Sequence, residues 1–169
     1  MKNCILCALL IFSIKGFAMV EAMNHVDLES YMGRWHEIAL IPNWFEKKCV
    51  TAATADYTLM KNGMVRVINR CMSSNGPSES AGVAWVVDKK TQAKLKVSFF
   101  PLARYFKWFG GDYYILFVDE NYTFAVVGSP SLKYLWLLAR DQTVSQRVYQ
   151  TFLAVAKKNG YDTEKIVRR

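Results

Sequence analysis

The side chains that most often carry catalysis are sparse in this sequence of 169 residues. It contains two histidines, His25 and His36, and neither lies in a local pattern typical of a nucleophile and its base. No His/Cys cluster has the spacing of metal ligands, and there is no phosphate loop or dinucleotide-binding motif. The sequence therefore predicts a binding protein without a cofactor rather than an enzyme.

One acidic residue, Glu37, is placed where it could take part in binding. If the segment around it forms a β-strand, Glu37 shares a face with Trp35, and His36 points to the opposite face. A carboxylate beside an apolar interior can hydrogen-bond the polar head of a ligand. It can equally be a buried structural acid paired with an arginine or a tyrosine, because buried charges are as a rule paired.

Two cysteines, Cys49 and Cys71, lie beyond the N-terminal apolar segment, and they flank the first expected hairpin. In an exported protein such a pair favours a disulfide. Pairing around the Asn62-Gly63 turn would put Thr54 opposite Cys71. A bridge therefore requires the chain before Thr51 to leave the ladder and curl back. The alternative is two separate thiols.

Short β-strands are the elements that would position these side chains. Runs rich in β-branched and aromatic residues alternate with turn signals, of which Asn62-Gly63 is the strongest. The expected strands are 34–40, 51–60, 64–71, 80–88, 94–100, 113–119, 123–127 and 134–139, with a loop at 73–78. Eight antiparallel strands can close into a barrel whose interior holds side chains or one small ligand.

The period of the apolar residues changes after the last strand. From 144 to 155 they recur at helical spacing, with Thr143 or Ser145 as the N-cap and Gly160 as the stop. The apolar stripe of this helix needs a partner. We expect it to dock on the outer face of the first strand, against His36 and Ile38. A short final strand can follow at 162–167.

A local motif marks the first strand. Residues 31–39 read Tyr-Met-Gly-Arg-Trp-His-Glu-Ile-Ala, and Arg140 closes the last expected strand. Gly33 lets the chain turn sharply into the strand. The guanidinium of Arg140 can cover the indole of Trp35, a cation–π contact of about 0.5–2 kcal/mol. Together Gly33, Trp35 and Arg140 are expected to plug one end of the barrel.

This combination resembles the lipocalin family, and residues 35–39 resemble its bacterial outer-membrane branch, which is related to apolipoprotein D. The resemblance covers residues 24–169. It implies an all-β fold, an eight-stranded antiparallel up-and-down β-barrel with a C-terminal α-helix packed on its outside. It also implies binding, and transport or storage, of a lipid-like ligand, a fatty acid or lysophospholipid, for maintenance of the cell envelope.

Strand alternation nominates the residues that line the barrel interior. The expected inward-facing side chains are Glu37, Ala39, Val97, Phe99, Tyr113, Ile115, Trp136 and Leu138. A register change of one residue would reverse any of these assignments. An apolar lumen would hold an acyl chain through about 0.8 kcal/mol for each buried CH₂ group.

Two loops concentrate aromatic residues. Trp44 and Phe45 follow a proline, and they form either a lid or a cover for the edge of the barrel. Residues 104–108 alternate aromatic and cationic side chains. They form either a membrane-facing entrance loop or a cap that shields the mouth of the barrel.

The N-terminal segment has the pattern of a secretory signal. A short basic start precedes an apolar run from 4 to 14, which is too short to span a bilayer. Cleavage after Ala18 or Ala22 fits, so we expect a signal peptide at 1–18 and export to the periplasm or outer membrane. Lipid anchoring requires a cysteine directly after the apolar run, and none stands there. The sequence therefore favours a form without a lipid anchor.

Charge and composition leave several functions open. Removal of Lys2 and Lys15 with the signal lowers the formal charge from +8 to +6, which favours anionic membrane surfaces or serves solubility. Nucleic acid is not expected, since arginine-rich runs and reading motifs are missing. The alternatives to a lipid carrier are a haem or carotenoid-type ligand, an isomerase or hydrolase that uses Glu37, and a membrane-surface module. A homodimer also stays open.

Overall fold

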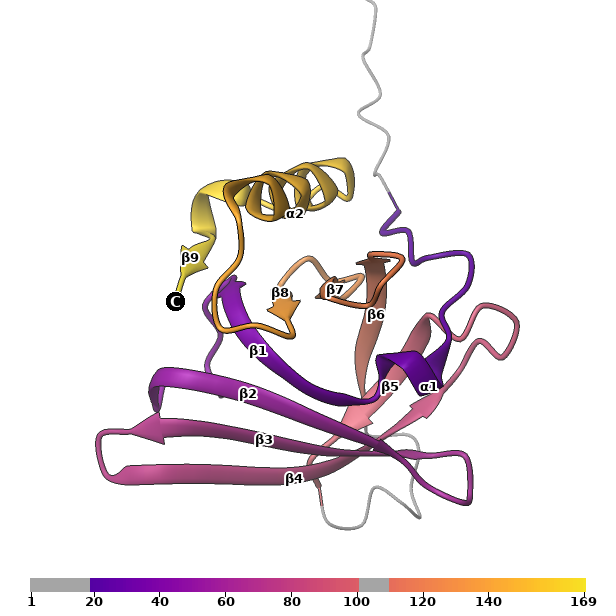
Figure 1. Ribbon diagram of the computed structural model, residues 1–169, viewed down its shortest axis with the longest axis horizontal. Helices are drawn as coiled ribbons and strands as arrows, with labels where there is room; N and C mark the ends of the chain where they lie inside the picture. Colours follow the sequence, from indigo (N-terminus) through magenta and orange to yellow (C-terminus); the bar gives the residue numbers. More distant parts are fainter. Residues whose placement is uncertain (1–18, 101–109) are drawn as a thin grey trace, which may run out of the picture.

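The computed structural model describes residues 19–100 and 110–169, which form a barrel with one long helix on its outside (Figure 1). The elements in chain order are α1 (Leu28–Tyr31), β1 (Gly33–Leu40), β2 (Cys49–Leu59), β3 (Val65–Ser73), β4 (Gly76–Val86), β5 (Lys94–Ser98), β6 (Gly111–Val118), β7 (Phe124–Gly128), β8 (Leu135–Ala139), α2 (Gln146–Lys158), the 3-10 helix η1 (Thr163–Lys165) and β9 (Val167–Arg168).

Strands β1 to β8 form a closed antiparallel ring in which each strand pairs with its sequence neighbours. The ring closes because β1 pairs with both β2 and β8. β2 pairs with β1 only from Gly33 to His36. β9 pairs with the same edge of β1 beyond that point, at Ala39 and Leu40. The predicted eight-stranded up-and-down barrel is therefore confirmed, and the short final strand β9 adds a ninth strand to the sheet.

The first hairpin differs from its expected register at the turn and again at two β-bulges. The ladder runs without a shift from Leu59 opposite Val65 to Thr54 opposite Arg70, so the turn is centred on Asn62. Thr54 therefore pairs with Arg70 rather than with Cys71, and the predicted pairing is wrong by one residue. Further shifts between Thr54 and Cys49 bring Cys49 opposite Ser73. A bulge places two residues of one strand opposite one residue of its partner. The two bulges in β2 therefore bring Cys49 two positions closer along β3 to Cys71 than a regular ladder would.

The segment at 73–78 is a tight hairpin rather than the predicted loop. Ser73 pairs with Gly76, so β3 and β4 run to the turn itself. The Ser73 hydroxyl donates to the Gly76 carbonyl at 2.7 Å. Gly76 has a φ of +104°, which favours glycine because it has no Cβ. Local capping of the turn thus lets both strands extend further than their β-rich sequence indicates.

Trp35 and Arg140 close one end of the barrel. Trp35 is fully buried, and the Arg140 guanidinium carbon lies 3.8 Å from the centre of its ring. The same guanidinium donates to the backbone carbonyls of Ser30, Met32, Arg34 and Tyr122. Gly33 has a φ of +98°. The helical turn before the strand, the first strand and the last strand are thereby tied together at this end.

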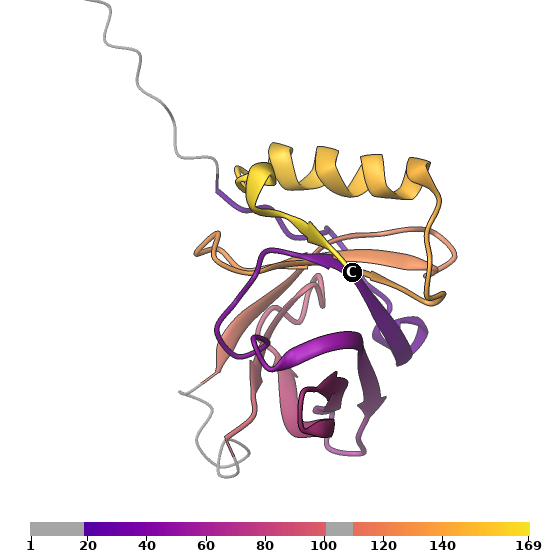
Figure 2. The ribbon, with the colours of Figure 1, turned by 90° about the vertical axis from the view of Figure 1, so that its left-hand side faces the viewer.

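Helix α2 lies along the outside of the barrel, against β7 and β8 (Figure 2). Ser145 caps its start, and Gly160, with a φ of +82°, follows its end. Its buried Phe152 packs in an outer cluster with side chains of β1, β7 and β8, among them Ile38. Ile38 takes part as predicted, but the helix packs mainly on β7 and β8 rather than on β1, so the predicted docking site is only partly correct. Among the described residues, no helix has both the length and the apolar character to cross a membrane.

Candidate ligand-binding site

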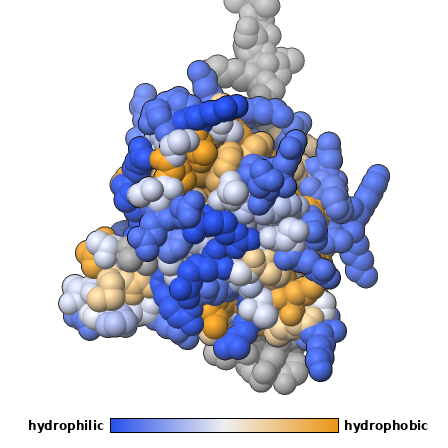
Figure 3. Space-filling model, in the orientation of Figure 1, coloured by the Kyte–Doolittle hydropathy of each residue, from blue (hydrophilic) through white to orange (hydrophobic). Residues whose placement is uncertain are grey.

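The barrel encloses a cavity of about 840 Å³. It extends from Leu28 and Tyr31 at the α1 end to the segment 44–49 and Phe99 at the other end. Trp44 is 74 % exposed there, which marks this end as the mouth. Val50 and Met72 are exposed nearby on β2 and β3. Figure 3 shows apolar surface at this edge, where β2 and β4 begin and β3 ends. The cavity is therefore deep, with an apolar rim.

Most of the residues nominated by strand alternation line this cavity. They are Glu37, Val97, Phe99, Tyr113, Ile115, Trp136 and Leu138. Ile115 is fully buried, and Leu138 is nearly so, while Phe99 is partly exposed toward the mouth. Of these side chains, the aliphatic Ile115 and Leu138 are the most deeply buried, and the aromatic Phe99 is the most exposed.

Ala39 does not line the cavity, and its nomination is a correction. A bulge in β1 lies between Glu37 and Ala39: Glu37 pairs with Leu138, but Ala39 pairs with Leu137. Leu137 belongs to the outer cluster beneath α2, and Ala39 belongs to it as well. The bulge adds one residue to the strand, so the alternation that held from Trp35 to Glu37 is reversed at Ala39.

Aromatic rings from two segments form the mouth. Tyr134 and Trp136 stack with ring centres 6.0 Å apart, and Phe45 packs on both of them. Trp44 contacts Phe45 edge-on at 5.6 Å. Trp44 and Phe45 both line the cavity, so they belong to its entrance. The aromatic segment at 104–108 lies outside the described residues.

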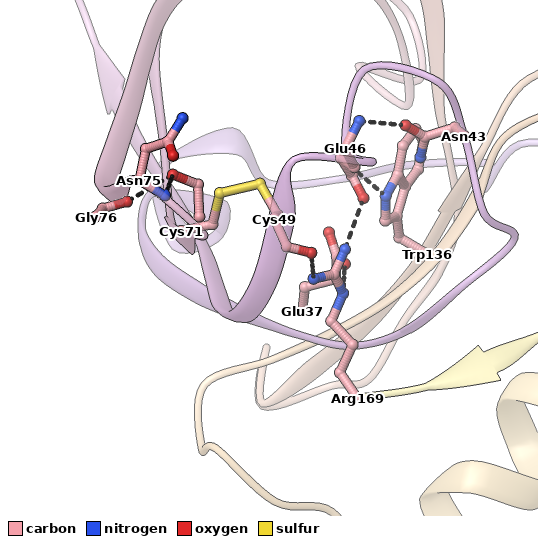
Figure 4. Close-up of a disulfide and its surroundings, with 10 residues drawn as sticks. Glu37, Asn43, Glu46, Cys49, Cys71, Asn75, Gly76, Trp136 and Arg169 are labelled. Carbon is pink, nitrogen blue, oxygen red and sulfur yellow. Dashed lines mark hydrogen bonds and ion pairs between the residues drawn. A yellow bond between two sulfur atoms is a disulfide. The ribbon is translucent and has the colours of Figure 1, made fainter.

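A group of charged side chains lies in the wall below this mouth (Figure 4). Glu37 forms an ion pair with Arg169 at 2.5 Å. Arg169 also reaches Glu46, at 3.3 Å, and donates to the Cys49 carbonyl. Glu46 accepts a hydrogen bond from the indole N–H of Trp136 at 3.0 Å. Glu37 is therefore the buried, arginine-paired acid that the sequence left as one of two options.

Burial changes the acidity of this group. The side chain of Glu37 is 9 % exposed, and its burial raises its pKa to about 8. The negative charge of Glu46 acts in the same direction, and Arg169 opposes both. The contact of Glu37 with Arg169 is an ion pair without the alignment of a hydrogen bond. Burial and Glu46 thus oppose the ionisation of Glu37, and the ion pair with Arg169 favours it.

A disulfide joins Cys49 and Cys71 beside this charged group (Figure 4). Their Cα atoms are 5.5 Å apart, within the ordinary range for such a bond. The bond ties the start of β2 to β3, at the place where β2 has left the edge of β1. Arg169 occupies the gap that remains, because its backbone N–H donates to Ile38 and its side chain to Cys49.

Three tyrosine hydroxyls meet inside the barrel. Tyr31 and Tyr57 each lie within hydrogen-bond distance of the Tyr113 hydroxyl, at 2.8 and 3.0 Å. All three residues line the cavity. Burial raises the pKa of Tyr57 to about 12. Tyr113 was nominated from the sequence, but Tyr31 and Tyr57 were missed, although inward alternation on the second strand could have indicated Tyr57.

Within the described parts of the chain, no group of three or more His, Cys, Asp and Glu side chains could hold a metal ion. His36 lies on the outer side of β1, away from the cavity lining. The chemistry that this cavity offers is therefore apolar contact, with a few hydroxyl, amide and carboxyl groups for orientation.

The family of the chain follows from its sequence as well as from this geometry. Residues 26–169 match the family model described as a lipocalin-like domain. The chain belongs to the lipocalin family. The match covers the whole barrel, α2 and β9, so the lipocalin domain includes every element that builds the cavity.

Named relatives of this lipocalin come from plants, bacteria and animals. Temperature-induced lipocalin-1 of Arabidopsis thaliana is 36 % identical over 87 % of this chain and 80 % of its own length. The outer membrane lipoprotein Blc of Vibrio cholerae is 34 % identical over 96 % of this chain and 94 % of its own. Apolipoprotein D of Mus musculus is 34 % identical, over 85 % and 76 %. The resemblance to the outer-membrane branch and to apolipoprotein D is thus confirmed.

The fold also matches solved lipocalin structures of low sequence identity. Insecticyanin from the tobacco hornworm Manduca sexta superimposes with a TM-score of 0.67 at 18 % identity, covering 89 % of this chain and 83 % of that one. At that identity the likeness bears on the fold alone.

Proposed function

We propose that this lipocalin binds and carries or stores a long-chain, lipid-like ligand, a fatty acid or a lysophospholipid. The observation that supports this most is the cavity of about 840 Å³, walled mainly by aliphatic and aromatic side chains. Its size lies within the range of small-molecule sites. A ligand with a long apolar portion is the class that such a wall stabilises.

The energy of such binding comes mostly from apolar burial. Each methylene removed from water contributes about 0.8 kcal/mol. A chain of roughly a dozen buried methylenes then offsets the several kcal/mol that association costs, without a specific contact. Binding of this kind selects for length and shape, and family membership favours it over catalysis.

We further propose that the protein works in the cell envelope. The segment 1–18, which lies outside the described residues, has the composition of a signal peptide, and 24–169 would be the exported domain. The disulfide between Cys49 and Cys71 fits an oxidising compartment. The relative from Vibrio cholerae is an outer membrane lipoprotein by name.

Titration with a lysophospholipid tests the proposal. Trp136 lines the mouth, so ligand entry should quench tryptophan fluorescence and displace an environment-sensitive dye. Trp136→Ala should weaken binding at least several-fold while the protein stays folded, since one aromatic contact is lost. Tyr149→Ala, which removes a half-buried aromatic from α2 outside the barrel, is the matched control and should bind normally.

Two results would contradict this function. One is a wild-type protein that neither quenches nor displaces the dye with any long-chain lipid. The other is a visible absorption band in freshly purified protein, which would indicate a haem or carotenoid-type ligand. Mass spectrometry of co-purified lipid, from protein isolated without detergent, identifies the natural ligand directly.

A further inference from the structure

The hydroxyl cluster of Tyr31, Tyr57 and Tyr113 crosses the interior of the barrel. Tyr57 lies on β2 and Tyr113 on β6, which are four strands apart in either direction around the ring of eight. Tyr31 comes from α1, at the closed end. Side chains from opposite walls thus meet near the bottom of the cavity, above the buried Trp35, whose ring centre is 4.9 Å from that of Tyr31.

The cluster has one hydrogen-bond donor more than it can use. Three hydroxyls bring three protons, but only two contacts join them, both at Tyr113. Whichever way the protons are arranged, one O–H has no acceptor within the cluster. Among the described residues, none of these hydroxyls makes a hydrogen bond to any other group. Burial raises the pKa values of all three, so the hydroxyls stay protonated.

A second unsatisfied group lies one step closer to the mouth. The side-chain oxygen of Asn69 is buried and has no partner among the described residues. On β3, Asn69 follows Val67 on the same face, and Val67 pairs with Tyr57. Asn69 also lines the cavity. Buried polar groups are nearly always hydrogen-bonded, so a hydroxyl proton and an amide oxygen without partners on one stretch of lumen wall favour a polar ligand group there.

We propose that the hydroxyl cluster and Asn69 form a polar subsite that binds an oxygen-bearing group, a hydroxyl or a carbonyl, on the inner end of an otherwise apolar ligand. This subsite rests on the proposed lipid-binding function and adds the ligand class to it. A ligand hydroxyl or carbonyl accepts a hydrogen bond from the surplus tyrosine O–H, and a hydroxyl can also donate to the Asn69 oxygen. A plain methyl end leaves both groups without partners, which disfavours it.

Two lysophosphatidylcholines test the subsite, one with a palmitoyl chain and one with an ω-hydroxypalmitoyl chain. The large charged head keeps each molecule in the same direction, so only the group at the inner end differs. In the wild type, the hydroxylated chain should bind at least as tightly as the plain one. In the Tyr31→Phe/Tyr57→Phe/Tyr113→Phe variant, its affinity relative to the plain chain should fall about ten-fold, the value of one hydrogen bond.

Two further variants complete the experiment. Tyr134→Phe removes a hydroxyl from the cavity mouth and should leave the affinity ratio unchanged. Asn69→Leu keeps the side-chain size and should lower the ratio on its own, which decides the matter if the triple variant does not fold. An equal ratio in wild type and Asn69→Leu, or in wild type and triple variant, overturns the subsite. If plain chains still bind in that case, the proposed lipid-binding function stands. A wild-type protein that binds neither lipid would reject both the lipid-binding function and the subsite.

Discussion

At the scale of single residues, Trp35 and Arg140 lend different kinds of stability to the closed end. Trp35 is fully buried, and Arg140 is partly exposed and holds four backbone carbonyls. Trp35→Ala should lower the free energy of unfolding by about 3–5 kcal/mol, through a large cavity. Arg140→Ala should lower it by less, because water can reach the freed carbonyls. Urea unfolding measures both. A variant that keeps its stability and loses only ligand would contradict the structural assignment.

The titration of Glu37 should make the stability of the protein depend on pH. Its pKa in the folded state, about 8, lies above its ordinary value of 4.5, so the folded protein binds more protons between these pH values than the unfolded chain does. The contribution of Glu37 to stability therefore falls as the pH rises through this window. Glu37→Gln removes the titration. We expect wild type to lose more stability than this variant between pH 5 and pH 8 in urea unfolding, and equal slopes would contradict the raised pKa.

The sequence could place Glu37 on the inner face but could not name its partners. Alternation over two residues is local and holds from Trp35 to Glu37. Arg169 and Glu46 reach the same place through β9 and the loop before β2, and contacts between such distant segments leave no mark in a local pattern. A choice between a ligand contact and a structural ion pair was therefore open until the fold placed Arg169 in the gap of the barrel wall.

At the scale of elements, the contact between Gly128 and Tyr161 holds the segment after α2 on the barrel. The Tyr161 hydroxyl donates to the Ser129 carbonyl at 2.8 Å, and a Cβ at Gly128 would overlap that hydroxyl. Gly128→Ala should therefore destabilise the protein by about 1–3 kcal/mol. Gly111→Ala is the control, because the nearest atom to its Cβ would lie 3.8 Å away. Thermal unfolding of both compares them, and equal melting temperatures would show that Tyr161 moves aside freely.

The disulfide is a second link between elements. It joins residues separated by 22 positions, and it anchors the start of β2 where β1 no longer pairs with it. Reduction, or Cys49→Ser with Cys71→Ser, should lower the free energy of unfolding by roughly 2–4 kcal/mol. Denaturant titration with and without reductant measures the loss. Two thiols that react with an alkylating reagent in the native, oxidised protein would contradict the bond.

The sequence predicts the regular parts of the strands and helices better than their irregularities. The strands and α2 were predictable because alternation and helical spacing run over many residues. Bulges were not, since an inserted residue in β1 or β2 follows from the closing of the ring and the pairing on both sides. Ala39 was therefore assigned to the wrong face. Thr54 was given the wrong partner for another reason, because the turn is centred on Asn62 rather than between Asn62 and Gly63.

At the scale of the whole molecule, the barrel has a finite length for a chain to fill. Affinity for lysophospholipids should rise as the acyl chain lengthens, by at most about 0.8 kcal/mol for each CH₂ group, and level off once the lumen is full. Dye displacement over an acyl-length series gives this profile. An affinity independent of length would instead indicate binding through the head group or at the protein surface, and would contradict the container function.

The tyrosine cluster is a property of the closed barrel alone. Tyr57 and Tyr113 come together because β2 and β6 stand opposite each other in a ring of eight. Single-strand patterns assign a face to each residue but say nothing of what lies across the lumen. The resemblance to lipocalins therefore sufficed to predict the container, whereas the hydroxyl cluster at its inner end became visible only in the folded barrel.

The pairing of β1 with β8 also has a consequence for how the chain folds. β1 is the first barrel strand to leave a ribosome or a translocation channel, and β8 is the last. Until β8 arrives, β1 has one open edge, and open strand edges invite pairing between chains. Ring closure between the most distant strands also raises contact order, which slows folding. Newly made chains should thus pass through a period of aggregation risk that ends only when β8 reaches β1.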